Sequence, residues 1–185
     1  MSNHLDYEIN KELGECYLFM GEMDKAEEYY QKAAGSNGAH PDPYLGLATI
    51  ALQRGELDKA WSFYSKAAEI EADDKSLTGM ALVELEMQKV EEAFNHLSLA
   101  LDKNPENLIA LYNLVRAGSV SGKLDNVVAR LRAYLNADPN KVEVRYSLAG
   151  CLITLDRKDE AKAELNQILA ANPANDAARD LLATL

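Results

Sequence analysis

The stretch GELDKA at residues 55–60 decides the fold, because related six-residue stretches recur along the whole chain. Each one follows a turn-like pattern of Gly, Asp, Glu or Lys and ends on Ala or Val. The five stretches are GEMDKA (21–26), GELDKA (55–60), QKVEEA (88–93), GKLDNV (122–127) and DRKDEA (156–161). Their last residues lie 34, 33, 34 and 34 positions apart. Such regular spacing predicts an array of structural repeats.

Each repeat has the pattern of two short helices joined by this turn. Apolar residues recur at helical spacing on both sides of the turn. In the fourth repeat they are Leu111, Leu114 and Val115 before the turn and Val127, Leu131 and Leu135 after it. No strand-like alternation of apolar and polar residues competes with this pattern, which predicts an all-α protein.

The boundaries between repeats carry residues that end one helix and begin the next. Proline marks three of them, in KNPEN (103–107), ADPNK (137–141) and ANPAN (171–175). The first boundary, AGSNGAHPDP (34–43), is richer in glycine, and we expect Asp42 to cap a helix whose first residue is Pro43.

The residue types at fixed offsets in each repeat resemble those of the tetratricopeptide repeat. The first repeat supplies Leu13, Gly14, Tyr17, Ala26, Tyr30 and Ala33, and the second supplies Tyr44, Leu47, Ala48, Ala60, Tyr64 and Ala67. The fifth repeat supplies Leu148, Ala149, Ala161, Leu165, Ile168 and Pro173. The fourth departs most from the pattern, with Val115, Val127 and Tyr134 at three of these positions. The resemblance covers about residues 7–175, and it implies an architecture rather than a particular ligand.

The expected architecture is a right-handed α-solenoid of five tetratricopeptide-like helix-turn-helix pairs and a C-terminal helix. We expect one superhelical domain over residues 1–185. Its repeats are predicted at about 7–40, 41–73, 74–107, 108–141 and 142–175, with the terminal helix at 176–185.

The composition argues against several classes of function. The 185 residues include 30 acidic and 19 basic ones, and the formal net charge of −11 disfavours binding to nucleic acids. No apolar stretch approaches the length needed to span a bilayer, so direct membrane insertion is not expected. The N-terminus lacks the basic and apolar regions of a signal peptide, and we expect a cytoplasmic protein.

No arrangement of residues predicts catalysis. His4, His40 and His96 fall in different repeats without metal-ligand spacing, so neither a metal nor another cofactor is expected. Cys16 and Cys151 occupy equivalent positions of the first and fifth repeats, and we expect both to be buried packing residues. The chain is therefore predicted not to be an enzyme.

The resemblance implies that the first helix of each repeat lines a concave groove that binds ligands. Residues at the inward-facing offsets form a mixed surface with an apolar strip, which suits a peptide or an amphipathic helix with apolar anchors. The candidate binding residues are Leu45, Thr49, Leu52, Leu82, Leu85, Tyr112, Asn113, Arg116 and Tyr146. Each leucine in this set could equally be a core residue.

The fourth repeat differs from the others in charge. It carries a net charge of +3 over residues 108–141, whereas every other repeat is acidic. We hypothesise that Arg116 grips an acidic or C-terminal group of a partner, because a guanidinium can bind a carboxylate through two hydrogen bonds. The alternative is that Arg116 pairs with Glu143 or simply offsets its acidic neighbours.

The sequence thus predicts a protein–protein interaction scaffold or adaptor, with a protein or peptide partner of unknown identity. The carboxylate clamp of chaperone-binding tetratricopeptide domains is not present, since only Lys11 matches it. Two alternatives stay open. One is a self-assembling structural protein that stacks through Leu181, Leu182 and Leu185, and the other is a regulatory fragment of a larger enzyme.

Overall fold

The computed structural model describes residues 2–185, and it describes side chains from His4 onward. Across these residues the chain forms eleven α-helices and no strand, which confirms the all-α prediction. The backbone divides into two compact units, residues 1–103 (unit 1) and residues 104–185 (unit 2). The prediction that residues 1–185 form one domain stays a prediction.

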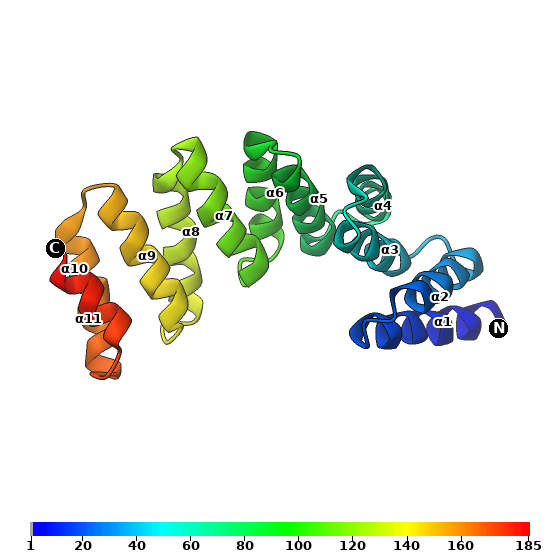
Figure 1. The fold of residues 1–185 in the computed structure, drawn as a ribbon, viewed down its shortest axis with the longest axis horizontal. Helices are drawn as coiled ribbons and strands as arrows, with labels where there is room; N and C mark the ends of the chain where they lie inside the picture. The colour runs from blue at the N-terminus through cyan, green and yellow to red at the C-terminus, as the bar shows by residue number, and fades with distance from the viewer. Residues whose placement is uncertain (1) are drawn as a thin grey trace. The chain divides into compact units, whose positions relative to one another are not determined.

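Consecutive helices pair as helical hairpins within each unit (Figure 1). Unit 1 contains α1 (Ser2–Phe19), α2 (Met23–Ser36), α3 (Asp42–Gln53), α4 (Leu57–Ile70), α5 (Asp74–Glu86) and α6 (Val90–Lys103). Unit 2 contains α7 (Leu108–Ser121), α8 (Leu124–Ala137), α9 (Val142–Thr154), α10 (Lys158–Ala171) and α11 (Asp176–Ala183). The pairs fall where the repeats were predicted, although α1 begins earlier than residue 7.

The turn inside every hairpin has one residue in the left-handed backbone region. Glycine supplies it in three repeats, where the φ angles of Gly21, Gly55 and Gly122 lie between 71° and 77°. In the other two repeats Gln88 and Asp156 adopt φ angles of 62° and 58°. The fold therefore imposes this conformation even where the sequence does not offer glycine.

Three of the loops between repeats begin the following helix with a side-chain cap, whereas α9 begins after Lys141 without one. Asn107 Oδ1 accepts a hydrogen bond from the backbone N–H of Ala110 at 2.9 Å, and Asn175 caps α11 in the same way. The first boundary differs from the prediction by one residue: Asp42 is the first residue of α3, and Pro41 occupies the cap position. The carboxylate of Asp42 instead accepts a hydrogen bond from the hydroxyl of Tyr7 at 3.4 Å.

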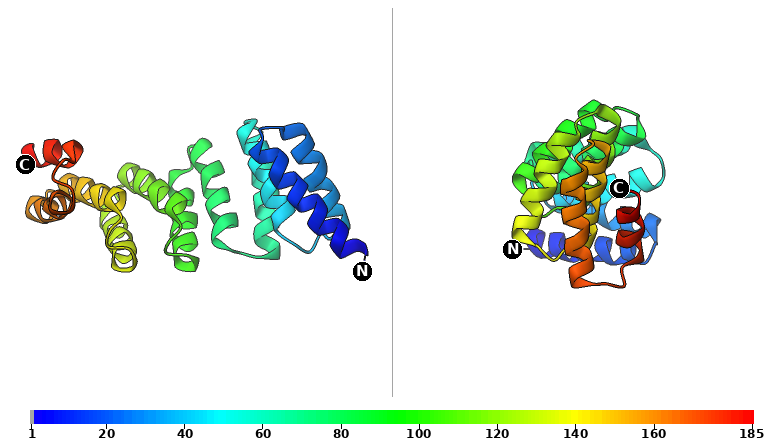
Figure 2. Two further views of the ribbon diagram at one scale, coloured as in Figure 1. Left: turned by 90° about the horizontal axis from the view of Figure 1, so that it is seen from below. Right: turned by 90° about the vertical axis from the view of Figure 1, so that its left-hand side faces the viewer.

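Tyrosine rings fill the spaces between neighbouring helices of unit 1, where α1 and α2 lie side by side (Figure 2). The Tyr30 ring of α2 fits against Gly14 of α1 and Gly46 of α3. A Cβ atom on Gly46 would lie 2.3 Å from Cζ of Tyr30, so only glycine permits this approach. Tyr64 of α4 packs against Gly79 of α5 in the same manner.

Mostly aliphatic side chains build the core of unit 2, which also buries the ring of Tyr134. Leu131, Leu148, Leu152 and Leu165 are fully buried there. The terminal helix α11 inserts Ala178 into a cluster with Ala149, Leu165 and Ile168. Leu181, Leu182 and Leu185 pack against that cluster and are half-buried, so they cover the last repeat of their own chain.

Candidate functional site

The predicted groove residues of unit 1 lie on α3 and α5. Leu45, Thr49, Leu52 and Leu82 are half-buried. Leu85 is only 7% exposed and is a core residue on the packed side of α5, which is the alternative that the sequence left open for each leucine.

Thr49 has a structural partner in addition to its place on this surface. Its hydroxyl donates to the carbonyl oxygen of Leu45 at 2.8 Å and lies 3.2 Å from the hydroxyl of Tyr64. Thr49 therefore helps to hold the Tyr64 ring in the interface between α3, α4 and α5.

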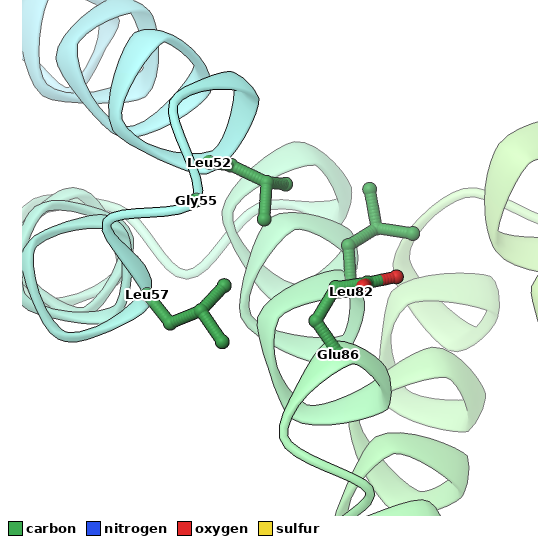
Figure 3. Close-up of a pocket in the computed structure, with 5 residues that line it drawn as sticks. All are labelled: Leu52, Gly55, Leu57, Leu82 and Glu86. Atoms are coloured by element: carbon green, nitrogen blue, oxygen red, sulfur yellow. The ribbon is translucent and has the colours of Figure 1, made fainter.

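A cavity of about 390 Å³ opens beside Leu52 and Leu82. Its lining is completed by Gly55 and Leu57 at the turn between α3 and α4 and by Glu86 at the end of α5. Figure 3 shows Leu52 and Leu57 pointing toward α5 from the two sides of the Gly55 turn. Two of the predicted apolar residues of unit 1 thus lie together at one cavity.

In unit 2 the exposed face of α7 carries several of the predicted binding residues. Ile109 is 60% exposed, Tyr112 is 37% exposed and Val120 is 72% exposed, and Arg116 is also exposed. These four residues lie three or four positions apart, which places them on one side of the helix. Asn113 is half-buried, and its side-chain amide donates to the carbonyl oxygen of Ile109 at 2.8 Å.

The arginine at the centre of this face differs from the other arginines of the chain. Within residues 2–185, Arg116 is the arginine whose guanidinium takes part in no hydrogen bond or ion pair. Glu143, which the sequence offered as a partner, instead lies 3.9 Å from the amine of Lys141. The guanidinium of Arg116 is therefore available to a ligand.

Tyr112 and Tyr146 occupy the same offset in neighbouring repeats but have different surroundings. Partial burial and the nearby carboxylate of Glu143 raise the pKa of Tyr112 above its ordinary value. Tyr146 is half-buried and packs against the cluster that α11 covers. Tyr112 thus belongs to the exposed face of α7, whereas Tyr146 also contributes to the core.

Several arginines of unit 2 are held in ion pairs. Arg157 and Arg132 both contact the carboxylate of Glu160, and their hydrogen bonds lower its pKa to about 2. Arg145 pairs with Glu164 between α9 and α10. These arginines stabilise contacts between helices, which leaves Arg116 as the candidate for recognition.

One buried polar cluster was not anticipated from the sequence. Glu84 of α5 is 3% exposed, and its carboxylate lies 2.7 Å from Nδ1 of His96 on α6. The ring of Trp61 on α4 approaches His96 edge-on, with ring centres 6.1 Å apart. Burial raises the pKa of Glu84, and the His96 contact offsets part of that rise. No residue spacing marked this cluster, because its members come from three helices.

The cysteines and histidines form no cluster that could hold a metal among the described residues. Both cysteines are free thiols. Cys151 is buried as expected, and burial raises its pKa, but Cys16 is exposed. The prediction for Cys16 is wrong because α1 is the first helix of unit 1 and its side carrying Cys16 is not covered by another described helix.

The sequence matches the family model of the tetratricopeptide repeat over residues 20–81 and 120–185, which is more than half of the chain. The chain therefore belongs to the tetratricopeptide repeat family, as the repeat pattern predicted. Proteins with this fold serve in general as scaffolds for protein–protein interaction and are typically not catalytic. No helix within residues 2–185 has both the length and the apolar character needed to cross a membrane.

Similar proteins include one curated relative and several solved structures. BBSome complex member BBS4 from Bos taurus is 35% identical over 119 residues, which are 64% of this chain and 22% of the relative. The match thus spans less than a quarter of that protein.

Among solved structures, PilF of Pseudomonas aeruginosa has a TM-score of 0.78 and 19% identity, with 100% of this chain and 90% of PilF covered. YrrB, described as a tetratricopeptide repeat protein with an unusual peptide-binding site, has a TM-score of 0.69 and 16% identity, with coverage of 90% and 87%. MamA from Desulfovibrio magneticus has a TM-score of 0.71 and 15% identity, with coverage of 92% and 97%. These similarities show the fold.

Proposed function

We propose that this protein is an adaptor that binds a peptide or helical segment of a partner protein on the exposed face of α7. The observation that carries the proposal is Arg116, an exposed arginine without a partner in the described structure, between the exposed apolar residues Ile109 and Val120. A charged group flanked by apolar anchors is a common arrangement in peptide-binding surfaces.

The chemistry of this face defines the partner segment. Its apolar side chains would cover Ile109, Val120 and the ring of Tyr112, and its carboxylate would accept hydrogen bonds from Arg116. The carboxylate is an Asp or Glu side chain or a free C-terminus. A charge-assisted pair of this kind contributes about 1.5–3 kcal/mol when it is partly shielded from water.

Two similar proteins support a role in protein assembly. YrrB is described as having a peptide-binding site, and BBS4 is named as a member of a complex. These two similarities support only a general role in protein assembly. The proposed chemistry of the partner segment rests on the residues of α7.

The proposal is tested by affinity capture from native lysate with the wild-type chain and with Tyr112→Ala/Arg116→Glu. Lys158→Glu is the control, because it makes the same change of charge on an exposed residue of α10. A partner that binds through α7 is retained by the wild type and the control and is lost by the double variant.

A second measurement defines the carboxylate. The segment recovered from the partner is synthesised in its native form and with each carboxylate replaced by an amide. One amide form should bind at least about tenfold more weakly to the wild type and should show no further loss with Arg116→Glu. Equal binding of all forms would remove Arg116 from the site.

The self-assembly alternative is distinguished by sedimentation of the purified chain over a range of concentrations. Leu181, Leu182 and Leu185 pack on their own repeat, so no described feature favours it. A mass that rises with concentration, and falls to that of the monomer in Leu182→Asp while α11 remains helical, would support self-assembly instead.

A further inference from the structure

We propose that the cavity of unit 1 binds an apolar side chain of a partner segment next to a lysine or arginine of the same segment. This is a second binding site with the opposite charge preference to the face of α7, and it does not depend on the function proposed for that face. Its residues are Leu52, Leu57, Leu82 and Glu86, around the turn at Gly55.

Three leucines form the apolar walls of the cavity, and two of them are held in place by the core of unit 1. Leu52 and Leu57 pack against the core cluster formed by residues such as Ala51, Ala60 and Tyr64. Leu82 is half-buried and lies outside that cluster, so part of its surface is open to the cavity. The volume of about 390 Å³ is within the range of small ligand pockets and exceeds what one leucine or phenylalanine side chain requires.

The carboxylates at the rim set the charge of the occupant. Glu86 is exposed and has no hydrogen bond or ion pair within the described part of the chain. A neighbouring hollow of about 460 Å³ shares Gly55 and Leu57 with the cavity and is also lined by Glu56, Asp58, Lys59 and Met87. Asp58 is likewise exposed and without such a partner among the described residues, whereas Glu56 is paired with Lys59 at 2.6 Å. Two carboxylates thus remain uncompensated beside an apolar opening.

The charge of the whole unit acts in the same direction. Residues 1–103 contain twenty acidic and nine basic residues, which gives a formal net charge of −11. A field of this sign attracts cationic segments and repels acidic ones at low salt. The cavity therefore favours an apolar residue flanked by a basic one over the acidic segment that Arg116 would select.

The test is selection of a randomised seven-residue peptide library on the immobilised full chain, at low salt. Peptides that bind the cavity should be enriched for an apolar residue next to Lys or Arg. Their affinity should fall at least about fivefold with Glu86→Lys and at least about tenfold with Leu82→Ser. Glu69→Lys is the matched control, because Glu69 is exposed on α4 of the same unit and does not border the cavity.

Methyl NMR spectra of the chain with a selected peptide show where on the chain the peptide binds. The methyl resonances of Leu52, Leu57 and Leu82 should shift on binding, and the spectra of the variants should show that they remain folded. The same selection separates the two sites, because peptides bound at α7 should be acidic and should respond to Arg116→Glu.

Three results would overturn the proposal. One is the absence of enriched peptides with an apolar–basic pair. Another is enrichment of such peptides whose binding is the same for Glu86→Lys and for Glu69→Lys. The third is a set of methyl shifts that excludes the three cavity leucines.

Discussion

The two units of this protein fill the space between their helices with different side chains. In unit 1 the rings of Tyr30 and Tyr64 fill the space between repeats, and Gly46 and Gly79 receive them. One repeat period after Tyr64 the chain has Leu97, and in unit 2 the same position is Leu131 and then Leu165. The positions that follow Gly79 at the same period are Asn113 and Ser147. In unit 2 the smaller side chain of Leu131 is thus followed, in the next repeat, by Ser147 instead of a glycine.

The units also differ in electrostatics. Unit 1 has a formal net charge of −11, whereas unit 2 contains ten acidic and ten basic residues and is neutral. Burial raises the pKa of Tyr30 to about 12, which reflects its position inside the packing of unit 1. One repeat architecture therefore tolerates both an aromatic, acidic unit and a mostly aliphatic, neutral one.

The largest expected effect comes from adding one methyl group to unit 1. In Gly79→Ala the new Cβ would lie 2.1 Å from Cε1 of Tyr64, so we expect a loss of about 2–3 kcal/mol in the free energy of unfolding. Denaturant titration followed by Trp61 fluorescence measures it, since the single tryptophan lies on α4.

Gly150→Ala is the matched change in unit 2. No heavy atom lies within 4 Å of its new Cβ, and Gly150 is inside α9, so alanine should stabilise the helix by about 0.5–1 kcal/mol. Circular dichroism measures this change. Equal effects of the two substitutions would contradict the difference between the units.

The next effect tests whether the tyrosine is what requires glycine. Tyr64→Leu gives this position the residue type found in unit 2. It should lower the free energy of unfolding by about 1–3 kcal/mol, because the smaller side chain leaves a cavity. Gly79→Ala added to Tyr64→Leu should then be tolerated, with a coupling free energy of at least about 1 kcal/mol in a double-mutant cycle. Additive losses would show that Tyr64 does not set the requirement.

A smaller effect concerns the buried carboxyl of unit 1. Because the folded-state pKa of Glu84 is raised, its contribution to stability is present at low pH and is lost as the pH rises through that value. Glu84→Gln should therefore gain stability relative to the wild type between about pH 4 and about pH 7. Hydrogen exchange of α5 and α6 measures the difference in stability between the variant and the wild type. A stability difference that stays constant across this pH range would contradict the prediction.

Glu160 of unit 2 should show the opposite sign. Arg157 and Arg132 lower its pKa to about 2, so its stabilisation is present above the unfolded pKa and is lost as the pH falls through the folded value. Glu160→Gln should be slightly less stable than the wild type at neutral pH, and the difference should vanish toward pH 2. Hydrogen exchange of α8 and α10 tests this, with Glu84→Gln as the control that leaves these helices unchanged.

The smallest effect is that of salt. Screening reduces repulsion within unit 1, so raising NaCl from about 0.05 M to about 0.5 M should stabilise it by a few tenths of a kcal/mol. Unit 2 should change less or lose stability, because its exposed ion pairs are screened as well. Hydrogen exchange measured at both salt concentrations compares the units within one sample, and equal changes would contradict the electrostatic comparison.

The sequence by itself determined the repeat, its period and the family. A period of 34 residues with small residues at fixed offsets specifies helical hairpins, because each hairpin must bury one face against the next. The turns at Gly21, Gly55 and Gly122 and the caps at Asn107 and Asn175 are local features, and local residue chemistry is readable from the chain.

Only the tertiary structure decided which residues are available to a partner. Leu82 and Leu85 lie on the same helix, yet one is half-buried beside a cavity and the other is buried. The same holds for Arg116, whose lack of a partner depends on where Glu143 and Lys141 come to lie. Helical periodicity gives the direction of a side chain, but burial and pairing depend on what neighbouring helices place against it.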